Sequence, residues 1–279
     1  MKEKAVETLP SMKVEDAAAN LATGVAGTLV AALAVLDIEP SDRLPRLEPT
    51  IEMLIAGAKP APNGIFWDFN PTSFKPPVGF VGGTAGIDYC LAHLRRHLNV
   101  SYDALLAGSL AYANSTFDEQ FGNWPDQDST VQFRHIRRPD MEKSMLDGTT
   151  DKLAASIKVD DSISWGVGTL GILKARALVA KTCPNTYLGE IARADCTRAI
   201  ARLNGVSADE LAGLDSSIFT GLTGLTLALD SCSEAAFQLP ESVANLINLA
   251  YLKYNGNIIL SHYYPIIRYR YLTMLRAGC

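Results

Sequence analysis

Four copies of a Gly-x-x-Gly motif, each followed directly by an apolar segment, limit most strongly how this chain can fold. The copies begin at Gly24, Gly83, Gly168 and Gly221. The segments that follow are rich in Leu and Ala and are longer than an ordinary strand, which predicts helices. Strand patterns are scarce elsewhere in the chain. The sequence therefore predicts a repeated helical unit.

The stretches between these apolar segments predict a second kind of helix. Residues 187–203 carry apolar side chains at helical spacing, and residues 101–113 and 241–252 are similar. A helix that is apolar all round must be enclosed, and amphipathic helices can enclose it. We therefore expect an all-α fold, an α/α toroid of paired inner and outer helices in an incomplete or compressed form.

The glycines suit such a ring. Inner helices converge where they begin, and glycine leaves room there and keeps the first backbone N–H groups open to the centre. In the alternative interpretation, the glycines only let helices pack closely. The gap between the second and third copies is longer than the other two, which predicts an irregular insertion at about residues 117–160 of a single domain, 1–279. This insertion is either a binding segment over one face or a surface loop without a role.

Net charge and cysteine content indicate which partners and which cellular compartment to expect. A net charge of −5 gives no reason to expect a nucleic-acid partner. Five cysteines without a C-x-x-C pair predict reduced thiols in a cytoplasmic protein. Residues 17–36 are uncharged and long enough to span a membrane, but they are mostly Ala with Gly, Thr and Asn among them. We expect no membrane contact.

Three stretches resemble motifs of the lanthionine-synthetase cyclases, the LanC-like family. Residues 64–87 resemble the family segment that ends in Gly-Phe-x-His-Gly-x-x-Gly-Ile. Residues 164–172 resemble its Ser-Trp-Cys-x-Gly-x-x-Gly-Ile, and residues 215–224 resemble its stretch with Cys-His-Gly-x-x-Gly. The motifs occur in family order, and with residues 24–27 the resemblance covers roughly residues 20–225. It implies a toroid of paired helices, in agreement with the repeat.

The resemblance also implies a zinc site whose ligands are missing here. The family holds zinc with a Cys from the second motif and a Cys-His pair from the third, and these positions match Gly166, Phe219 and Thr220. The histidine of the first motif matches Gly82. Zinc sites use thiolate, imidazole and carboxylate groups, so we expect no metal and no cofactor. The cyclase domains of class III, kinase-fused lanthipeptide synthetases similarly lack the ligands. The loss of the zinc ligands therefore does not by itself mean that the protein has lost its activity.

His93 and His97 have the spacing of two ligands on a helix, but Arg95 and Arg96 lie between them and would repel a divalent cation. We interpret the pair as a solvated helix face.

The remaining candidate residues fall into two groups. The candidate catalytic residues are Thr220 as a hydroxyl donor, Trp165 as a cavity wall, and His135 or Asp215 as a proton carrier. The candidate substrate-binding residues are Gly83, Gly168, Gly221, Arg134 and Arg138. Each has an alternative: Trp165 could fill the core, Asp215 could cap a helix, and the arginines could belong to a solvated loop.

The resemblance implies two possible functions. The first is a zinc-independent cyclase that adds a Cys thiol of a ribosomally made precursor peptide to a dehydroamino acid, forming a thioether ring in lanthipeptide (RiPP) biosynthesis. A kinase- or lyase-like enzyme would dehydrate that peptide beforehand. The second is a non-catalytic toroid that binds a precursor peptide or a partner enzyme as a scaffold. Whether the protein is an enzyme stays open at this point.

Overall fold

The computed structural model describes six continuous stretches of the chain and four further residues. The stretches are 18–38, 47–67, 76–98, 102–125, 162–207 and 221–234, and the further residues are Glu210, Leu214, Ser217 and Ile218. The helices formed by these residues are α2 (Val25–Ile38), α3 (Glu48–Ala56), α4 (Thr84–Leu98), α5 (Asp103–Asn114), α9 (Thr169–Thr182), α10 (Tyr187–Asn204) and α12 (Leu222–Glu234). One hairpin joins β1 (Ala58–Ala61) to β2 (Gly64–Trp67). The all-α fold class is confirmed, with this hairpin as its small β component.

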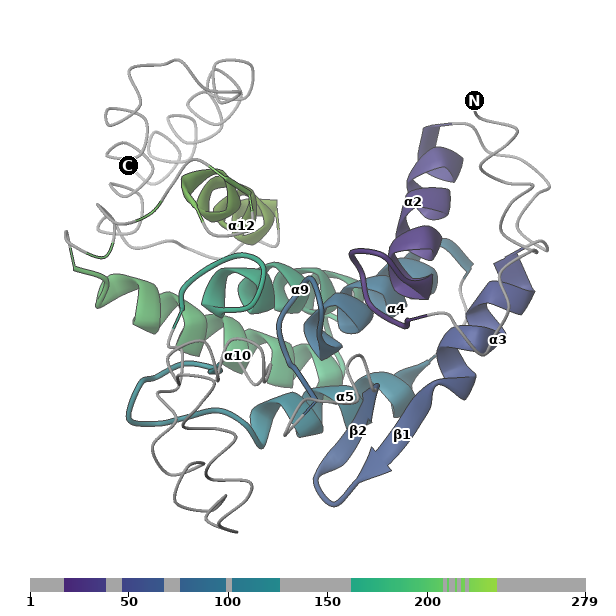
Figure 1. Cartoon of the computed structure of the whole chain (residues 1–279), viewed down its shortest axis with the longest axis horizontal. Coiled ribbons are helices and arrows are strands. Elements are labelled where there is room, and N and C mark those ends of the chain that lie inside the picture. Colours follow the sequence, from purple (N-terminus) through teal and green to yellow (C-terminus); the bar gives the residue numbers. More distant parts are fainter. Residues whose placement is uncertain are drawn as a thin grey trace, which may run out of the picture.

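The four helices that follow the Gly-x-x-Gly motifs form an inner layer. They pack in chain order, α2 on α4, α4 on α9 and α9 on α12. The outer helices cover them: α3 packs on α2, α5 on α4 and α10 on α9. Figure 1 shows α4 and α9 in the middle of the molecule, with α5 and α10 below them and α2 and α12 above them on opposite sides. The predicted pairing of inner and outer helices is confirmed.

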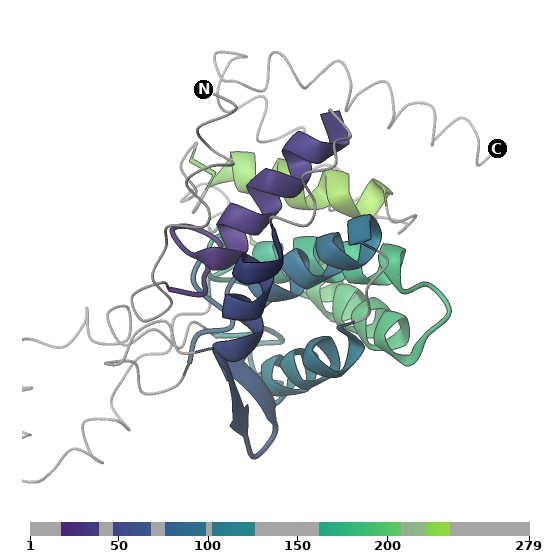
Figure 2. The same ribbon diagram turned by 90° about the vertical axis from the view of Figure 1, so that its right-hand side faces the viewer.

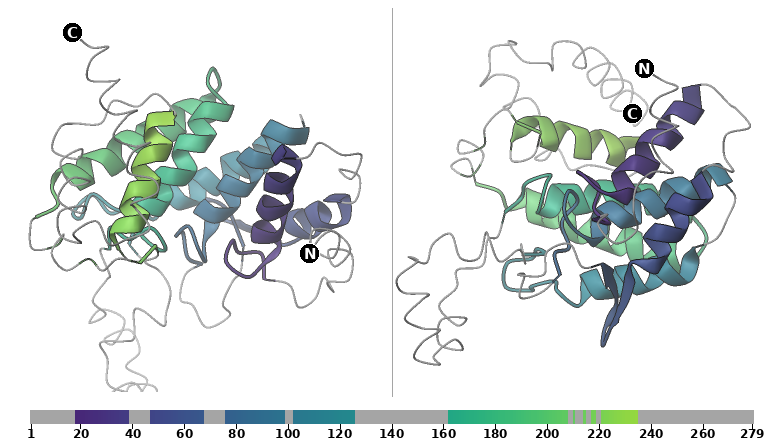
Figure 3. Two further views of the ribbon diagram at one scale, coloured as in Figure 1. Left: turned by 90° about the horizontal axis from the view of Figure 1, so that it is seen from above. Right: turned by 45° about the vertical axis from the view of Figure 1, so that its right-hand side comes forward.

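The inner helices form an arc. In the side view of Figure 2, α2 and α12 lie on one side of the α4–α9 layer and α5 lies on the other. Seen from above in Figure 3, α2 and α12 are separated across that layer. The described part of the chain is therefore a section of a two-layered toroid.

Apolar side chains fill the space between the two layers. One cluster lies among α9, α10 and α12 and includes Leu170, Leu203 and Leu225. The other lies among α2, α3, α4 and α5 and includes Leu29, Leu91 and Leu110. The amphipathic face predicted for residues 187–203 is confirmed, because Leu188, Ala192, Cys196, Ala199 and Ile200 are buried on α10. Thr186 caps this helix by accepting a bond from the Gly189 N–H at 3.3 Å.

The sequence analysis did not predict the β1–β2 hairpin. Its strands have four residues each, and Pro62 and Asn63 form the connection. The hairpin packs on α5. Gly64 has a φ of +144°, and a Cβ there would lie 2.2 Å from the Gly108 carbonyl oxygen. Gly64 pairs with Ala61 at the end of the turn, and a glycine at this position of positive φ is its local signal.

The start of the predicted insertion is anchored to α9. Asn123 Nδ2 donates to the Ser162 carbonyl at 3.0 Å, and the Thr169 hydroxyl donates to Asn123 Oδ1 at 2.5 Å. Trp124 is completely buried. Residues 126–161 and the helix predicted at 241–252 lie outside the described residues. Among the helices that are described, none has the length and hydropathy to cross a membrane.

Candidate functional site

The loops before α2, α4 and α9 bend back onto the start of the helix that they precede, and this is why these three motifs need their first glycine. A Cβ at Gly24 would lie 2.0 Å from the Ala18 carbonyl oxygen, and one at Gly168 would lie 1.8 Å from the Ser162 carbonyl oxygen. At Gly83 the corresponding distance, to the Pro77 oxygen, is 2.6 Å. We call the three loops, residues 18–24, 77–83 and 162–168, the collar.

The second glycine of each of the last three motifs lies against a side chain from the collar loop of the previous motif. A Cβ at Gly171 would lie 2.4 Å from the Phe80 Cβ, and one at Gly224 would lie 2.5 Å from the Trp165 Cβ. At Gly86 the neighbour is the Leu21 Cβ at 2.9 Å. Leu21, Phe80 and Trp165 each stand three residues before the first glycine of their own motif. Each collar loop therefore packs on the inner helix of the next motif: 18–24 on α4, 77–83 on α9 and 162–168 on α12.

Backbone hydrogen bonds join the collar loops to one another. The Ala22 N–H donates to the Val81 carbonyl at 3.2 Å, and the Val81 N–H donates to the Gly166 carbonyl at 2.9 Å. These residues occupy equivalent positions, two before each first glycine. The expectation of open N–H groups at the helix starts was wrong, because Val25, Thr84 and Leu170 donate theirs to the carbonyls of Ala18, Pro77 and Ile163.

The inner helices carry a stripe of half-buried side chains. On α9, the guanidinium of Arg176 bonds Asp195 of α10, so this residue faces the outer layer. Lys174 stands two residues earlier, about 200° around the helix, and therefore faces away from α10. Similar residues recur four apart on α4 and α12. The half-buried set, which we call the axial face, is Tyr89, His93 and His97 on α4, Lys174 and Leu178 on α9, and Leu227 and Ser231 on α12.

Lys174 joins three inner helices on this axial face. Its ammonium donates to the Ser231 hydroxyl at 3.0 Å and lies 5.5 Å from the centre of the Tyr89 ring. The Ser231 hydroxyl donates in turn to the Leu227 carbonyl at 2.9 Å, so a lone pair of its oxygen is left for the ammonium. A cation over an aromatic face is favourable, and together these contacts fix the position of the positive charge.

A line of aromatic rings leads from the collar to the axial face. The Trp165 and Phe80 rings are 4.6 Å apart between centroids, and Phe80 and Tyr89 are 5.1 Å apart. The line continues from Tyr89 to His93 at 4.5 Å, edge to face, and from His93 to His97 at 6.0 Å, stacked. The His93 imidazole therefore contacts two rings, and one of them, Tyr89, is also the cation–π partner of Lys174.

Residues 3–209 match the family model described as lanthionine synthetase C-like protein, a span of well over half the chain. The chain belongs to the LanC-like family. No curated protein gives a match to it.

The residues of this LanC-like chain do not fit the zinc that the family implies. Gly166 supplies no side chain, and its carbonyl oxygen already accepts the Val81 N–H. Phe219 has no donor atom for a metal. Within the stretches that the structure describes, no three His, Cys, Asp or Glu side chains are grouped as metal ligands would be. We therefore derive no catalytic step through zinc.

The structure describes some of the residues that the sequence singled out. Trp165 is half-buried and its ring packs against Phe80 at a tilt of 57°, so it combines a role in packing with a position at the collar. Gly83, Gly168 and Gly221 are buried at the starts of α4, α9 and α12. Gly83 and Gly168 lie directly against the loops that precede them, so bulky residues at these two positions would disrupt the collar itself. The other candidates, Thr220, His135, Asp215, Arg134 and Arg138, lie outside the described residues.

Sequence reasoning missed Tyr89, Lys174 and Ser231 and interpreted His93 as a solvated residue. The available signal was spacing: Tyr89, His93 and His97 are four residues apart on a helix that the repeat had already assigned to the inner layer. A polar stripe on an inner helix has to face either another helix or the centre of the ring. Lys174 is likewise a polar residue on an inner helix, α9.

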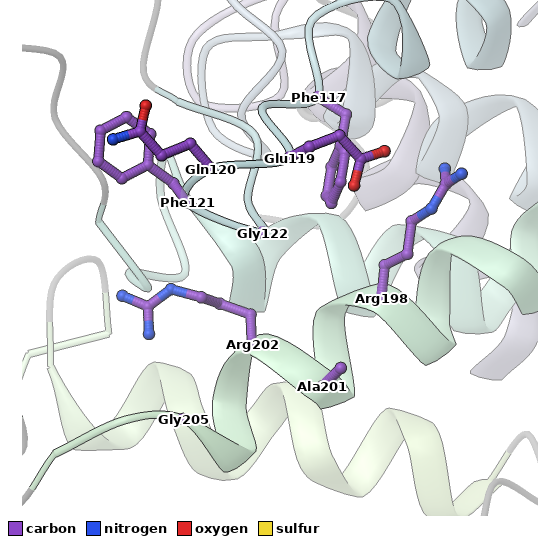
Figure 4. Close-up of a pocket in the computed structure, with 9 residues that line it drawn as sticks. All are labelled: Phe117, Glu119, Gln120, Phe121, Gly122, Arg198, Ala201, Arg202 and Gly205. Carbon is purple, nitrogen blue, oxygen red and sulfur yellow. The ribbon is translucent and has the colours of Figure 1, made fainter.

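A second candidate site lies on the outer layer, between the loop that follows α5 and the C-terminal half of α10 (Figure 4). This pocket has a volume of about 530 Å³ and includes Phe117, Phe121, Arg198 and Arg202 in its lining. The guanidinium of Arg198 lies 5.1 Å from the Phe117 ring centre, and Arg202 bonds Glu210 at 2.9 Å. Both arginines therefore already have partners within the protein.

Proposed function

We propose that this protein is a zinc-independent LanC-like cyclase that forms thioether rings in a ribosomally made precursor peptide. The observation that carries the proposal is the axial face, where an ammonium, an imidazole and a phenol converge on the inner helices. These groups can exchange protons with a substrate and stabilise negative charge. The absence of a side chain at Gly166 supports a reaction without the family's metal.

The reaction itself needs no oxidant or reductant. The thiol of a Cys loses its proton, and its sulfur bonds to the β-carbon of a dehydroalanine or dehydrobutyrine. The electron pair of the Cα=Cβ bond moves toward the carbonyl oxygen, and the resulting enolate takes a proton at Cα. The thiolate is the reactive form, and a free thiol is only a few per cent ionised at neutral pH. Holding thiol and alkene together supplies a further part of the rate.

The substrate requires an earlier step, because dehydroamino acids arise by loss of water from Ser or Thr. A kinase- or lyase-like dehydrating enzyme is the proposed partner, and the cytoplasm the proposed location. Thr220 stays in the proposal as a hydroxyl donor, His135 or Asp215 as a proton carrier, and Arg134 with Arg138 as contacts to the peptide.

The test is a cyclisation assay on a synthetic peptide that carries one dehydroalanine and one Cys. Ring closure leaves the mass unchanged but protects the thiol from N-ethylmaleimide, so mass spectrometry after alkylation counts open and closed peptide. We expect the protein to accelerate closure over the protein-free rate, and a chelator to leave that acceleration intact. Loss of the acceleration with the chelator would contradict zinc independence.

The scaffold alternative predicts a different outcome of the same assay. A scaffold would bind the peptide, as measured by fluorescence anisotropy of a labelled copy, without closing it faster than buffer does. Binding without acceleration would therefore reject the cyclase proposal in favour of the scaffold.

A further inference from the structure

We propose that His93 and Lys174 together replace the family's zinc: His93 accepts the proton of the substrate thiol, and Lys174 stabilises the thiolate and the enolate that follows. This inference rests on the proposed cyclase function and assigns the proton transfer to His93 in place of His135 or Asp215. It is drawn from the positions of the two side chains on the axial face.

The two groups are close enough to act on one substrate. The Tyr89 ring centre lies 4.5 Å from the His93 ring centre and 5.5 Å from the Lys174 ammonium. The imidazole and the ammonium are therefore at most about 10 Å apart, a span that a Cys and a dehydroalanine brought together for ring closure can bridge. Both side chains are half-buried. Since the Nε2 atom of His93 is buried, we assign Nδ1 as the nitrogen that receives the proton.

Each group is held in place by its neighbours. Ser231 and Tyr89 fix the ammonium from two different helices, α12 and α4. Tyr89 packs edge to face against the His93 ring and His97 stacks on it, so these two side chains fix the plane of that ring. A general base and an electrostatic stabiliser are effective when they are already positioned before the reaction begins, since no reorganisation is then required.

The assigned roles balance the reaction. The proton leaves the thiol for a nitrogen of His93 as the C–S bond forms and the Cα=Cβ pair moves to the carbonyl oxygen. Lys174 stabilises the negative charge, first on sulfur and then on oxygen. The same imidazolium returns its proton to Cα, so the chain ends the cycle as it began. Zinc would supply only the charge stabilisation, and here an ammonium takes over that part.

The experiment compares His93→Ala and Lys174→Gln with the unmodified protein in the cyclisation assay. A positioned base contributes about 10²- to 10⁴-fold, so we expect His93→Ala to lower the acceleration by about 100-fold or more. We expect added imidazole to restore part of that loss. Arg96→Gln, which removes an exposed positive charge from the same helix, is the matched control and should keep the full acceleration.

A second peptide separates the two roles. With selenocysteine in place of Cys, the attacking group ionises without help at neutral pH. His93→Ala should then lose little of the acceleration, whereas Lys174→Gln should still lose about tenfold, because the enolate charge is unchanged. Lys174→Arg keeps the positive charge and should recover part of the rate. Urea unfolding of each variant reports whether it is folded.

The outcomes distinguish this inference from the proposed function. If the unmodified protein accelerates closure and folded His93→Ala does so equally well with the Cys peptide, the inference is wrong while the cyclase proposal stands. Equal losses for both peptides, without rescue by imidazole, would assign His93 to packing and would also overturn it. If the unmodified protein gives no acceleration, the cyclase proposal and this inference both fall.

Discussion

Arg176 connects the two layers of the toroid through charge. It lies on inner helix α9 and bonds Asp195 of outer helix α10 through Nε at 2.9 Å and Asp88 of inner helix α4 at 2.5 Å. Its side chain and that of Asp88 are 0% exposed. Replacing Arg176 by Met keeps most of the volume and leaves two buried carboxylates without their shared partner.

Breaking a buried ion pair by removing one member costs about 3–5 kcal/mol, because the remaining charge is uncompensated. We expect Arg176→Met to lower the free energy of unfolding by this amount. Asp195 retains a contact with Arg198 at 3.3 Å, so most of the loss comes from Asp88. Replacing Asp88 and Asp195 by Leu in the same chain should restore most of the stability, since an apolar replacement of a buried ion network is often neutral or stabilising.

The loss of unfolding free energy in Arg176→Met should depend on pH. Burial raises the pKa of Asp88 above its usual value of 3.8, and Arg176 offsets only part of this rise. Without Arg176 the folded-state pKa rises further. A carboxyl group with a raised pKa stabilises the fold fully below its unfolded-state pKa, and that contribution is lost as pH rises through the folded-state pKa. The deficit of Arg176→Met should therefore be larger at pH 7.5 than at pH 5.

Urea titration followed by circular dichroism measures this directly, at both pH values and with a shared slope for all variants. A deficit below about 1 kcal/mol at pH 7.5 would be well under the cost of an unpaired buried charge. That result, or equal deficits at the two pH values, would refute the reasoning.

Three further predictions follow from packing and capping. Gly171→Ala should cost about 1–3 kcal/mol in urea unfolding, because its Cβ would lie 2.0 Å from the Trp165 carbonyl oxygen, whereas Gly82→Ala, with nothing within 4 Å, should be near neutral. Thr186→Ala should cost about 1 kcal/mol in the same assay through loss of the α10 cap, and Thr186→Ser should keep most of it. Burial raises the pKa of the Cys232 thiol to about 12 and also raises that of Cys90. Peptide mass spectrometry should therefore find both cysteines unlabelled by iodoacetamide in the native protein and labelled in urea.

The parts of the fold that were predictable from sequence are those with a local and repeated signal. The inner helices follow from apolar runs behind Gly24, Gly83, Gly168 and Gly221, and α10 follows from its helical periodicity. The β1–β2 hairpin was missed because four-residue strands give too short a pattern to read. The expectation of free N–H groups failed because their acceptors belong to loop residues seven positions earlier, which composition does not reveal.

The axial face was harder to predict for a different reason. Its contacts join residues far apart in the chain: Lys174 meets Ser231, 57 positions later, and the Tyr89 ring on another helix. Periodicity shows which side of an amphipathic helix is buried, but a nearly apolar helix gives no such indication. Which side of α9 is turned away from the described outer helices depends on how α2, α4 and α12 are arranged around it.

The bond between Asn123 and Ser162 holds together two residues that are 39 positions apart in the chain. Residues 126–161 are bracketed by this bond, with Trp124 buried on one side and Ile163 on the other. The ends of a segment fixed in this way do not move when the segment changes length, and doubling a loop costs only about 0.6 kcal/mol in closure entropy. This position is therefore a natural acceptor for grafted sequence: a tag, a reporter domain or a peptide from a relative could be exchanged here while the collar stays as it is.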